Sequence, residues 1–236
     1  MPLPSLPPAF HLVALDREVG AFERAVRAAP RGVDDGTLYW TDRTDCLDLA
    51  FVVEPEAPAA TTLQALYVLT VATGDALDSL LPPLAPVEYA WPGDLILAGA
   101  KLGQVRAAIA PVVDPAEVPP WLVLGLTLSV GPLGDDPGLL PNRTSLHDAG
   151  SHDVAVVQLV EAVSSRLLYW TSRWQKEGLA PVRASWNPRC FRIGQESDLT
   201  LADQHVAGCI LGLDANGSFS VGSARFRLAD HLNMIR

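Results

Sequence analysis

The stretch Trp91-Pro92-Gly93-Asp94-Leu95-Ile96-Leu97-Ala98-Gly99-Ala100-Lys101-Leu102-Gly103 decides the fold. An aromatic residue and a proline precede a carboxylate and an apolar run, a short turn follows, and a lysine opens the next run. This order predicts a tight β-hairpin that aims Lys101 across its face. A lysine in that place is suited to binding phosphate or carboxylate oxygens. A solvated hairpin lysine is the alternative, although the chain has only one other lysine, Lys176.

Outward from this hairpin, the hydrophobic pattern predicts short strands with helices between them. A proline-rich arm over residues 1–9 comes first. Strands are expected over 37–41, 47–55, 87–91, 94–98, 101–110 and 121–130. Helices are expected over 16–29, 60–80 and 152–177, with a short one around 144–150. The nearly continuous apolar run at 47–55 is typical of a strand that is buried on both faces.

The character of the chain changes after a predicted helix stop at residues 178–181. Five short strands are expected over 189–194, 198–202, 204–213, 218–222 and 224–228. Asp214-Ala215-Asn216-Gly217 is a strong hairpin-turn signal between the third and fourth of them. The predicted fold class is therefore α+β, with a mixed, mainly antiparallel sheet and flanking helices over 1–183 and a small β-barrel-like domain over 184–236.

Composition excludes several classes of protein. Of the 236 residues 49% are hydrophobic and 19% charged, which is incompatible with a disordered chain. The formal net charge of −10 lacks the positive field that non-specific nucleic-acid binding needs. Three widely spaced cysteines argue against a disulfide framework. The longest apolar run, 121–130, is too short to cross a membrane, and no signal peptide is recognised, so we expect a soluble cytoplasmic protein.

The residues around the hairpin resemble the biotin/lipoate–protein ligase family. That family carries Trp-Pro-Asn-Asp, a strand, and a return strand of the form Lys-Leu-x-Gly. Here the matching residues fall in place without gaps: Trp91, Pro92, Asp94, Lys101 and Leu102. Weaker matches follow in the family's order. They are a Gly-x-Gly-x-Asn-like strand at 121–130, a Thr-Ser-Leu segment at 144–150, the end of a long helix at 176–187 and a hairpin at 212–221.

The resemblance implies a two-step reaction in which ATP activates a carboxylic acid, biotin or lipoate-like, as an acyl-adenylate. The acyl group then passes to a lysine of a carrier protein. Lys101 would be the catalytic residue, holding the acid and the α-phosphate together. ATP and Mg²⁺ are the implied cofactors, no protein-bound metal is predicted, and a homodimer is left open. The implied substrate-binding residues are Trp91, Asp94, Lys101, Gly36, Trp40, Arg31 and Ser129.

The chain departs from the family where the family binds its ligands. Its arginine-containing glycine-rich loop is matched to residues 31–40, where Arg31 and the glycines remain but Asp34 and Asp35 replace the inner arginines. Two carboxylates would repel a triphosphate unless they recruit Mg²⁺. Ser129 stands where the family has asparagine, and Thr127 replaces the second glycine of that strand. We therefore expect no biotin transfer at an ordinary ligase rate.

A catalytically silent binding or scaffold protein on the same fold is the alternative function. An open cavity with Lys101 pointing inward would favour the enzyme, and a cavity filled by Tyr39, Trp40 or Arg17 the silent protein. 

Two other motifs have simpler explanations. His147 and His152, each followed by an aspartate, resemble a metal loop, but helix capping by Ser151 explains them equally and is preferred. Cys46 is flanked by Asp45 and Asp48, which raise rather than lower a thiol pKa and so oppose a nucleophilic role.

Overall fold

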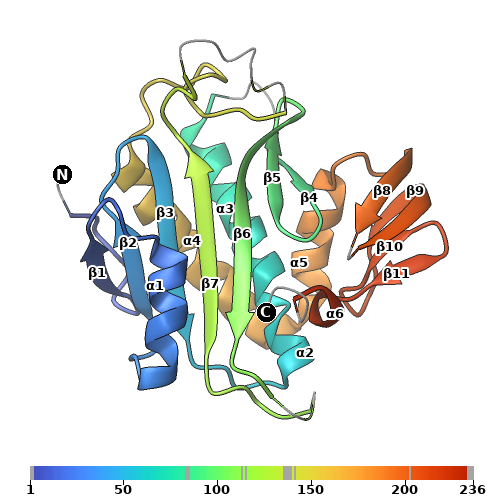
Figure 1. Cartoon of the computed structure of the whole chain (residues 1–236), viewed down its shortest axis with the longest axis horizontal. Coiled ribbons are helices and arrows are strands. Elements are labelled where there is room, and N and C mark those ends of the chain that lie inside the picture. Colours follow the sequence, from blue (N-terminus) through green and yellow to red (C-terminus); the bar gives the residue numbers. More distant parts are fainter. Residues whose placement is uncertain are drawn as a thin grey trace.

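The computed structural model describes residues 3–82, 86–112, 114, 116–134, 140, 142–201 and 203–232. Within them, one large sheet has the strand order β1-β2-β3-β7-β6-β5-β4 (Figure 1). Neighbouring strands are antiparallel except β1 and β2, which are parallel. The strands are β1 (His11–Leu15), β2 (Thr37–Thr41), β3 (Cys46–Val53), β4 (Glu88–Ala90), β5 (Asp94–Leu97), β6 (Ala100–Ile109) and β7 (Leu122–Ser129).

Helices cover both faces of this sheet (Figure 1). The short α2 (Ala59–Thr62) precedes α3 (Ala65–Leu80), and α3 and α4 (Val156–Glu177) lie behind the sheet in that view. In front, α1 (Ala21–Ala28) lies on β2, β3 and β7 and runs into a 3₁₀ turn, η1 (Ala29–Arg31). Successive residues of a strand point to opposite faces, so strands covered on both sides need apolar residues throughout. This explains the nearly continuous apolar runs of β3 and β7.

The alternation along β7 separates the two layers. Leu122, Leu124, Leu126 and Leu128 belong to the core beneath α3 and α4. Val123 packs in a smaller cluster with the alanines of α1. Gly125, on the same face as Val123, lies directly under the ring of Phe22, where a Cβ atom would come within 2.4 Å of that ring. The remaining α1-face positions of β7 are polar, and they form the site described below.

The C-terminal segment forms a four-stranded antiparallel sheet of order β11-β10-β9-β8. Its strands are β8 (Glu196–Leu201), β9 (Gln204–Leu213), β10 (Phe219–Val221) and β11 (Ala224–Phe226), and α6 (Leu228–Leu232) follows. The expected hairpin turn is confirmed, because the Asp214 carboxylate accepts hydrogen bonds from the backbone N–H groups of Asn216 and Ser218. The fold class is thus α+β, as the sequence predicts.

One hydrophobic core runs through both sheets. The indole of Trp91, just before β5, stacks on the ring of Phe219 in β10, with centroids 5.6 Å apart. Between the sheets, α5 (Leu179–Trp186) follows α4 immediately, after Gly178 at φ 71°. The predicted division at residue 183 falls within α5 and stays a prediction about independent folding.

Several local predictions are wrong. Residues 189–194 are not a strand but the end of a 3₁₀ helix, η3 (Asn187–Arg189), followed by turns. Residues 144–150 form turns rather than a helix. Ser151 does not cap α4, which begins at Val156, where the Gln158 side chain accepts a hydrogen bond from the Ala155 N–H. The helix expected over 16–29 is shorter, because the chain between β1 and α1 is needed to turn over the edge of the sheet.

Candidate active site

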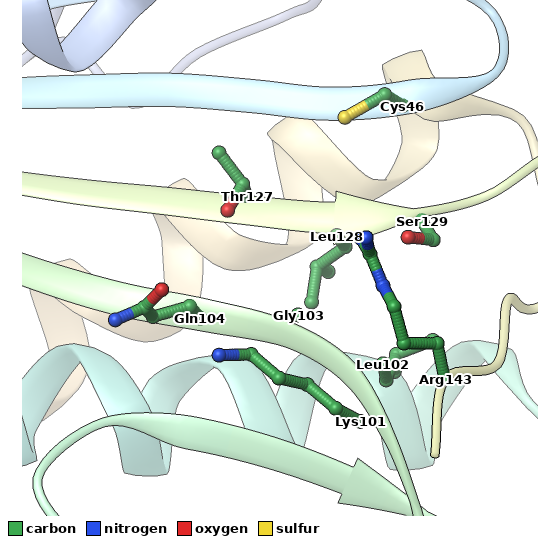
Figure 2. Close-up of a pocket in the computed structure, with 9 residues that line it drawn as sticks. All are labelled: Cys46, Lys101, Leu102, Gly103, Gln104, Thr127, Leu128, Ser129 and Arg143. Carbon is green, nitrogen blue, oxygen red and sulfur yellow. The ribbon is translucent and has the colours of Figure 1, made fainter. Parts of the chain in front are cut away.

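A cavity of about 410 Å³ opens on the α1 face of the sheet, at the C-terminal end of β7. Its size is within the range of small-molecule sites. Strands β3, β6 and β7 supply its floor, and the segment after β7 supplies one wall (Figure 2). The lining residues are Cys46, Lys101, Leu102, Gly103, Gln104, Thr127, Leu128, Ser129 and Arg143.

The predicted hairpin places Lys101 at this cavity. Ala98 and Gly99 make the turn with positive φ angles of 53° and 80°, and β6 begins with the next residue. On the side away from β5, the backbone of Lys101 is bound by the segment after β7. Its N–H donates to Asn142 O at 2.9 Å, and its carbonyl accepts from Thr144 N at 3.0 Å. The backbone of Lys101 is therefore fixed between β5 and the segment after β7.

The ammonium group of Lys101 forms an ion pair with Asp94. Lys101 Nζ lies 2.7 Å from Asp94 Oδ1, and the two side chains are 37% and 32% exposed. A pair that reaches solvent to this extent adds little to folding stability, typically about 1 kcal/mol or less. Its effect is on position, because Asp94 at the start of β5 keeps the cation at the cavity.

The floor of the cavity carries several polar side chains. Gln104 pairs with Thr127 across β6 and β7, and Cys46 pairs with Ser129 across β3 and β7. These side chains share the α1 face because the leucines between them on β7 point into the core below α3 and α4. In Figure 2 Lys101 extends along the floor toward Gln104, while Arg143, whose backbone is bridged to that of Lys101, extends toward Ser129. Two cations thus flank a floor of hydroxyl, amide and thiol groups.

The thiol of Cys46 is not prepared for nucleophilic attack. Burial raises its pKa, and the nearby Asp48 carboxylate raises it further. Reactive cysteines have lowered pKa values, because the thiolate is the nucleophile. Cys46 therefore serves as a small floor residue.

The aromatic residues expected at the ligand lie in the core. Trp40 is 1% exposed and Trp91 is 6% exposed. Both belong to the core on the α3 and α4 side of the sheet, and Trp91 Nε1 donates to Tyr67 Oη at 2.9 Å. Large aromatic side chains dominate core packing, which explains their placement here.

Gly36 and Arg31 lie far from Lys101. Gly36 N–H donates to Val52 O, at the end of β3 opposite to Cys46. Val52 lies six positions along the strand from Cys46, or about 20 Å. The start of α1 lies near the cavity, because the Ala21 N–H donates to Asp48 Oδ2. Arg31 lies at the other end of this segment, as the last residue of the 3₁₀ turn that follows α1.

The distance removes the expected repulsion of phosphate. Asp34 and Asp35 precede Gly36, and Asp35 Oδ1 accepts a hydrogen bond from Glu54 N at the same far end. About 20 Å exceeds twice the Debye length at physiological salt, so these carboxylates have little effect on an anion at Lys101. The connection nearest the cavity is instead residues 42–45, where the Asp45 carbonyl accepts from the N–H groups of Val130 and Gly131.

Sequence reasoning missed Gln104 and Arg143. Gln104 occupies the place of the glycine in the family pattern Lys-Leu-x-Gly, a signal that was available. Arg143 carries no motif and reaches the cavity only through the bridge between its backbone and that of Lys101. The rings of His147 and His152 lie in contact, with their centroids 4.4 Å apart. Among the described residues, however, no cluster of three or more His, Cys, Asp and Glu side chains is arranged to bind a metal.

No helix in the described part of the chain combines the length and the apolar character needed to span a membrane.

Comparisons with known proteins place the chain in a family. Residues 6–188 match the model of the biotin/lipoate A/B protein ligase family. A biotin–[acetyl-CoA-carboxylase] ligase of Paracoccus denitrificans is 24% identical over 172 residues, which are 71% of this chain and 70% of the relative. A biotin protein ligase-like protein of unknown function from a Silicibacter species is 31% identical, with a TM-score of 0.87 over 97% of this chain and 99% of its own.

The fold extends to enzymes with bound ligands. The biotin protein ligase of Aquifex aeolicus in complex with biotin and ATP has a TM-score of 0.75 at 18% identity, over 93% of this chain and 97% of its own. The family match covers most of the chain and includes every residue of the cavity. This chain belongs to the biotin/lipoate A/B protein ligase family.

Proposed function

We propose that this protein is an ATP-dependent acyl–protein ligase that activates a small carboxylic acid and transfers the acyl group to a lysine of a carrier protein. The observation that carries the proposal is the open cavity with Lys101 in its lining and Asp94 holding the ammonium group. Tyr39 and Trp40 pack in the two cores, and neither they nor Arg17 line the cavity. A silent protein with a filled cavity is therefore not favoured.

Lys101 and Arg143 bring positive charge to a site in a chain of net charge −10. Two unit charges of opposite sign about 4 Å apart attract each other by roughly 1–4 kcal/mol near a protein surface. The cations and the Ser129 and Thr127 hydroxyls fit a carboxylate or a phosphate group. Two carboxylates stand beside the cavity, Asp94 at Lys101 and Asp48 opposite Thr127 on β3, and Mg²⁺ would enter with the nucleotide.

The first step joins the acid to the nucleotide. A carboxylate oxygen attacks the α-phosphorus of ATP, the bond to the β-phosphate oxygen breaks, and pyrophosphate leaves. Lys101 would contact both the carboxylate and an α-phosphate oxygen, which reduces their repulsion and stabilises the charge that develops between them. Asp94 would act as a positioning residue through Lys101.

The second step transfers the acyl group. The neutral amine of a carrier-protein lysine attacks the acyl carbon, AMP leaves with the bonding electrons, and the new amide loses a proton to solvent. Two relatives, a biotin–[acetyl-CoA-carboxylase] ligase and a biotin protein ligase in complex with biotin and ATP, support ATP as the activating nucleotide and a protein as the acceptor.

The test is ATP-dependent hydroxamate formation, in which hydroxylamine replaces the carrier lysine. The purified protein would be incubated with ATP, Mg²⁺, hydroxylamine and one of biotin, lipoate, octanoate, succinate or malate. We expect hydroxamate and AMP with at least one acid and a loss of roughly 10²–10³-fold in Lys101→Ala, the effect of removing one charge-stabilising group. Lys176→Ala, which changes the exposed lysine at the end of α4, should keep the activity.

Saturable binding of an acid without hydroxamate or AMP would favour a binding protein over a ligase. Equal activity in Lys101→Ala and Lys176→Ala would refute the role of Lys101.

A further inference from the structure

Polar side chains from two strands line the floor of the cavity beside two leucines. Thr127 and Ser129 present hydroxyl groups from β7, and Gln104 presents an amide from β6. Polar groups that lose water without gaining a partner cost free energy, so an apolar ligand over this floor is disfavoured. The floor is matched by a ligand that is itself rich in hydrogen-bonding groups.

The cavity is also short. Ser129 and Thr127 are two residues apart on β7, a distance of about 7 Å along the strand. The next position on the same face, Gly125, is covered by the ring of Phe22, whose Cδ2 atom lies 2.4 Å from where a Cβ atom would be. The sheet surface that a longer ligand would use is already occupied by α1.

Phe22 is held in place from both sides. The Arg106 guanidinium lies 4.3 Å from the centre of its ring, and Arg106 Nη1 donates to Glu23 Oε1 at 2.7 Å. The pKa of Glu23 is lowered, because the Arg106 hydrogen bond and charge outweigh the opposing effect of burial. An ionised Glu23 keeps Arg106 over Phe22, which covers the α1-face position of β7 next to Thr127.

The charges at the rim call for an anion. Asp94 partly neutralises Lys101, whereas the Arg143 guanidinium makes no ion pair within the described part of the chain. A ligand with one carboxylate for Lys101 and a further polar or anionic group for Arg143 satisfies both cations.

We propose that the substrate is a compact polar carboxylic acid, one that bears a second carboxylate or a hydroxyl group close to the first, and that acids with a long apolar chain are excluded. The inference rests on the proposed function and names its substrate class. Thr127 and Gln104 fill space at positions where the family pattern has glycine, so they shorten and polarise the site together.

The experiment compares succinate and malate with octanoate, lipoate and biotin in the hydroxamate assay. We expect kcat/KM at least about a hundredfold higher for the best compact acid, because a hydrogen-bonding site strongly rejects analogues that leave its polar groups unpaired. Phe22→Ala should raise kcat/KM for octanoate, because it uncovers the sheet surface at Gly125. A Thr127→Gly, Gln104→Gly double variant should also raise it, because it removes polar side chains from the floor. Circular dichroism would establish that each variant is folded.

Thermal-shift measurements with the same acids, without ATP, test the substrate class separately from the ligase function. Stabilisation by compact acids alone supports the inference. Octanoate, lipoate or biotin turned over as well as succinate or malate would overturn it while leaving the ligase function intact. Absence of hydroxamate with every acid would overturn the ligase function, and absence of any thermal shift as well would overturn the substrate class.

Discussion

Tyr67→Phe tests the joint between the two sheets. Tyr67 in α3 is fully buried, and its hydroxyl donates to Gly217 O at 3.0 Å while accepting from Trp91 Nε1 at 2.9 Å. One oxygen atom thus links the large sheet's hairpin to the turn between β9 and β10. Removing this hydroxyl takes one hydrogen-bond partner from the buried Gly217 carbonyl and one from the buried Trp91 indole N–H. Each loss should cost roughly 1–2 kcal/mol of folding free energy.

The free energy of unfolding should therefore fall by roughly 2–4 kcal/mol. For a chain of this size each kcal/mol corresponds to about 2–4 °C in Tm, so Tm should fall by roughly 4–16 °C. Urea unfolding followed by tryptophan fluorescence measures the free energy, and thermal unfolding followed by circular dichroism measures Tm. Tyr169→Phe is the matched control, because Tyr169 on α4 is 54% exposed, and it should change stability by about 0.5 kcal/mol or less. A Tyr67→Phe protein as stable as the control would refute the reasoning.

Gly36→Ala should lower the free energy of unfolding by about 1–2 kcal/mol, because φ is +77° at this position and a Cβ atom would lie 2.2 Å from Ala9 O. Hydroxamate formation should be unchanged at a temperature where the variant is folded, because Gly36 lies far from Lys101. Lost activity in the folded variant would contradict this. Burial raises the pKa of Cys190 from 9.0 to about 12, so the folded state holds the proton more tightly than the unfolded chain. The contribution of Cys190 to the free energy of unfolding should then be constant below about pH 9 and fall from there to about pH 12, so Cys190→Ala should show a shallower fall over that range in urea titrations; an identical slope would argue against it. Cys46 should react with iodoacetamide at pH 7.5 at least about tenfold more slowly than glutathione, because its pKa is raised, and faster labelling by mass spectrometry would reopen the nucleophile hypothesis.

The centre of the large sheet was predictable because β3 and β7 are buried along most of both faces. They read as nearly continuous apolar runs because α3 and α4 lie on one side and α1 on the other. β1 was missed, since its five residues at the sheet edge are partly exposed and carry no such run. The segment at 189–194 has a strand-like composition, but Pro188 within η3 removes a backbone donor and favours the turn that returns the chain to Tyr89.

At the site, motif matching located Lys101, Asp94 and Ser129, because the ungapped hairpin and one strand end carry them. It failed to assemble the remaining floor, since Cys46 and Arg143 reach the cavity only through strand order and a loop bridge. The match of the glycine-rich loop to Gly36 had no support from geometry. That glycine serves a close approach of two backbones at the other end of the sheet.

The central claim is that the Lys101 cavity joins a carboxylic acid to the α-phosphate of ATP. Acid-dependent exchange of labelled pyrophosphate into ATP measures this half-reaction directly, without a carrier protein or hydroxylamine. The account predicts exchange that requires succinate or malate, persists in Lys176→Ala and falls by roughly 10²–10³-fold in folded Lys101→Ala. Exchange of equal rate in Lys101→Ala, or none with any of the five acids in the wild-type protein, would contradict it.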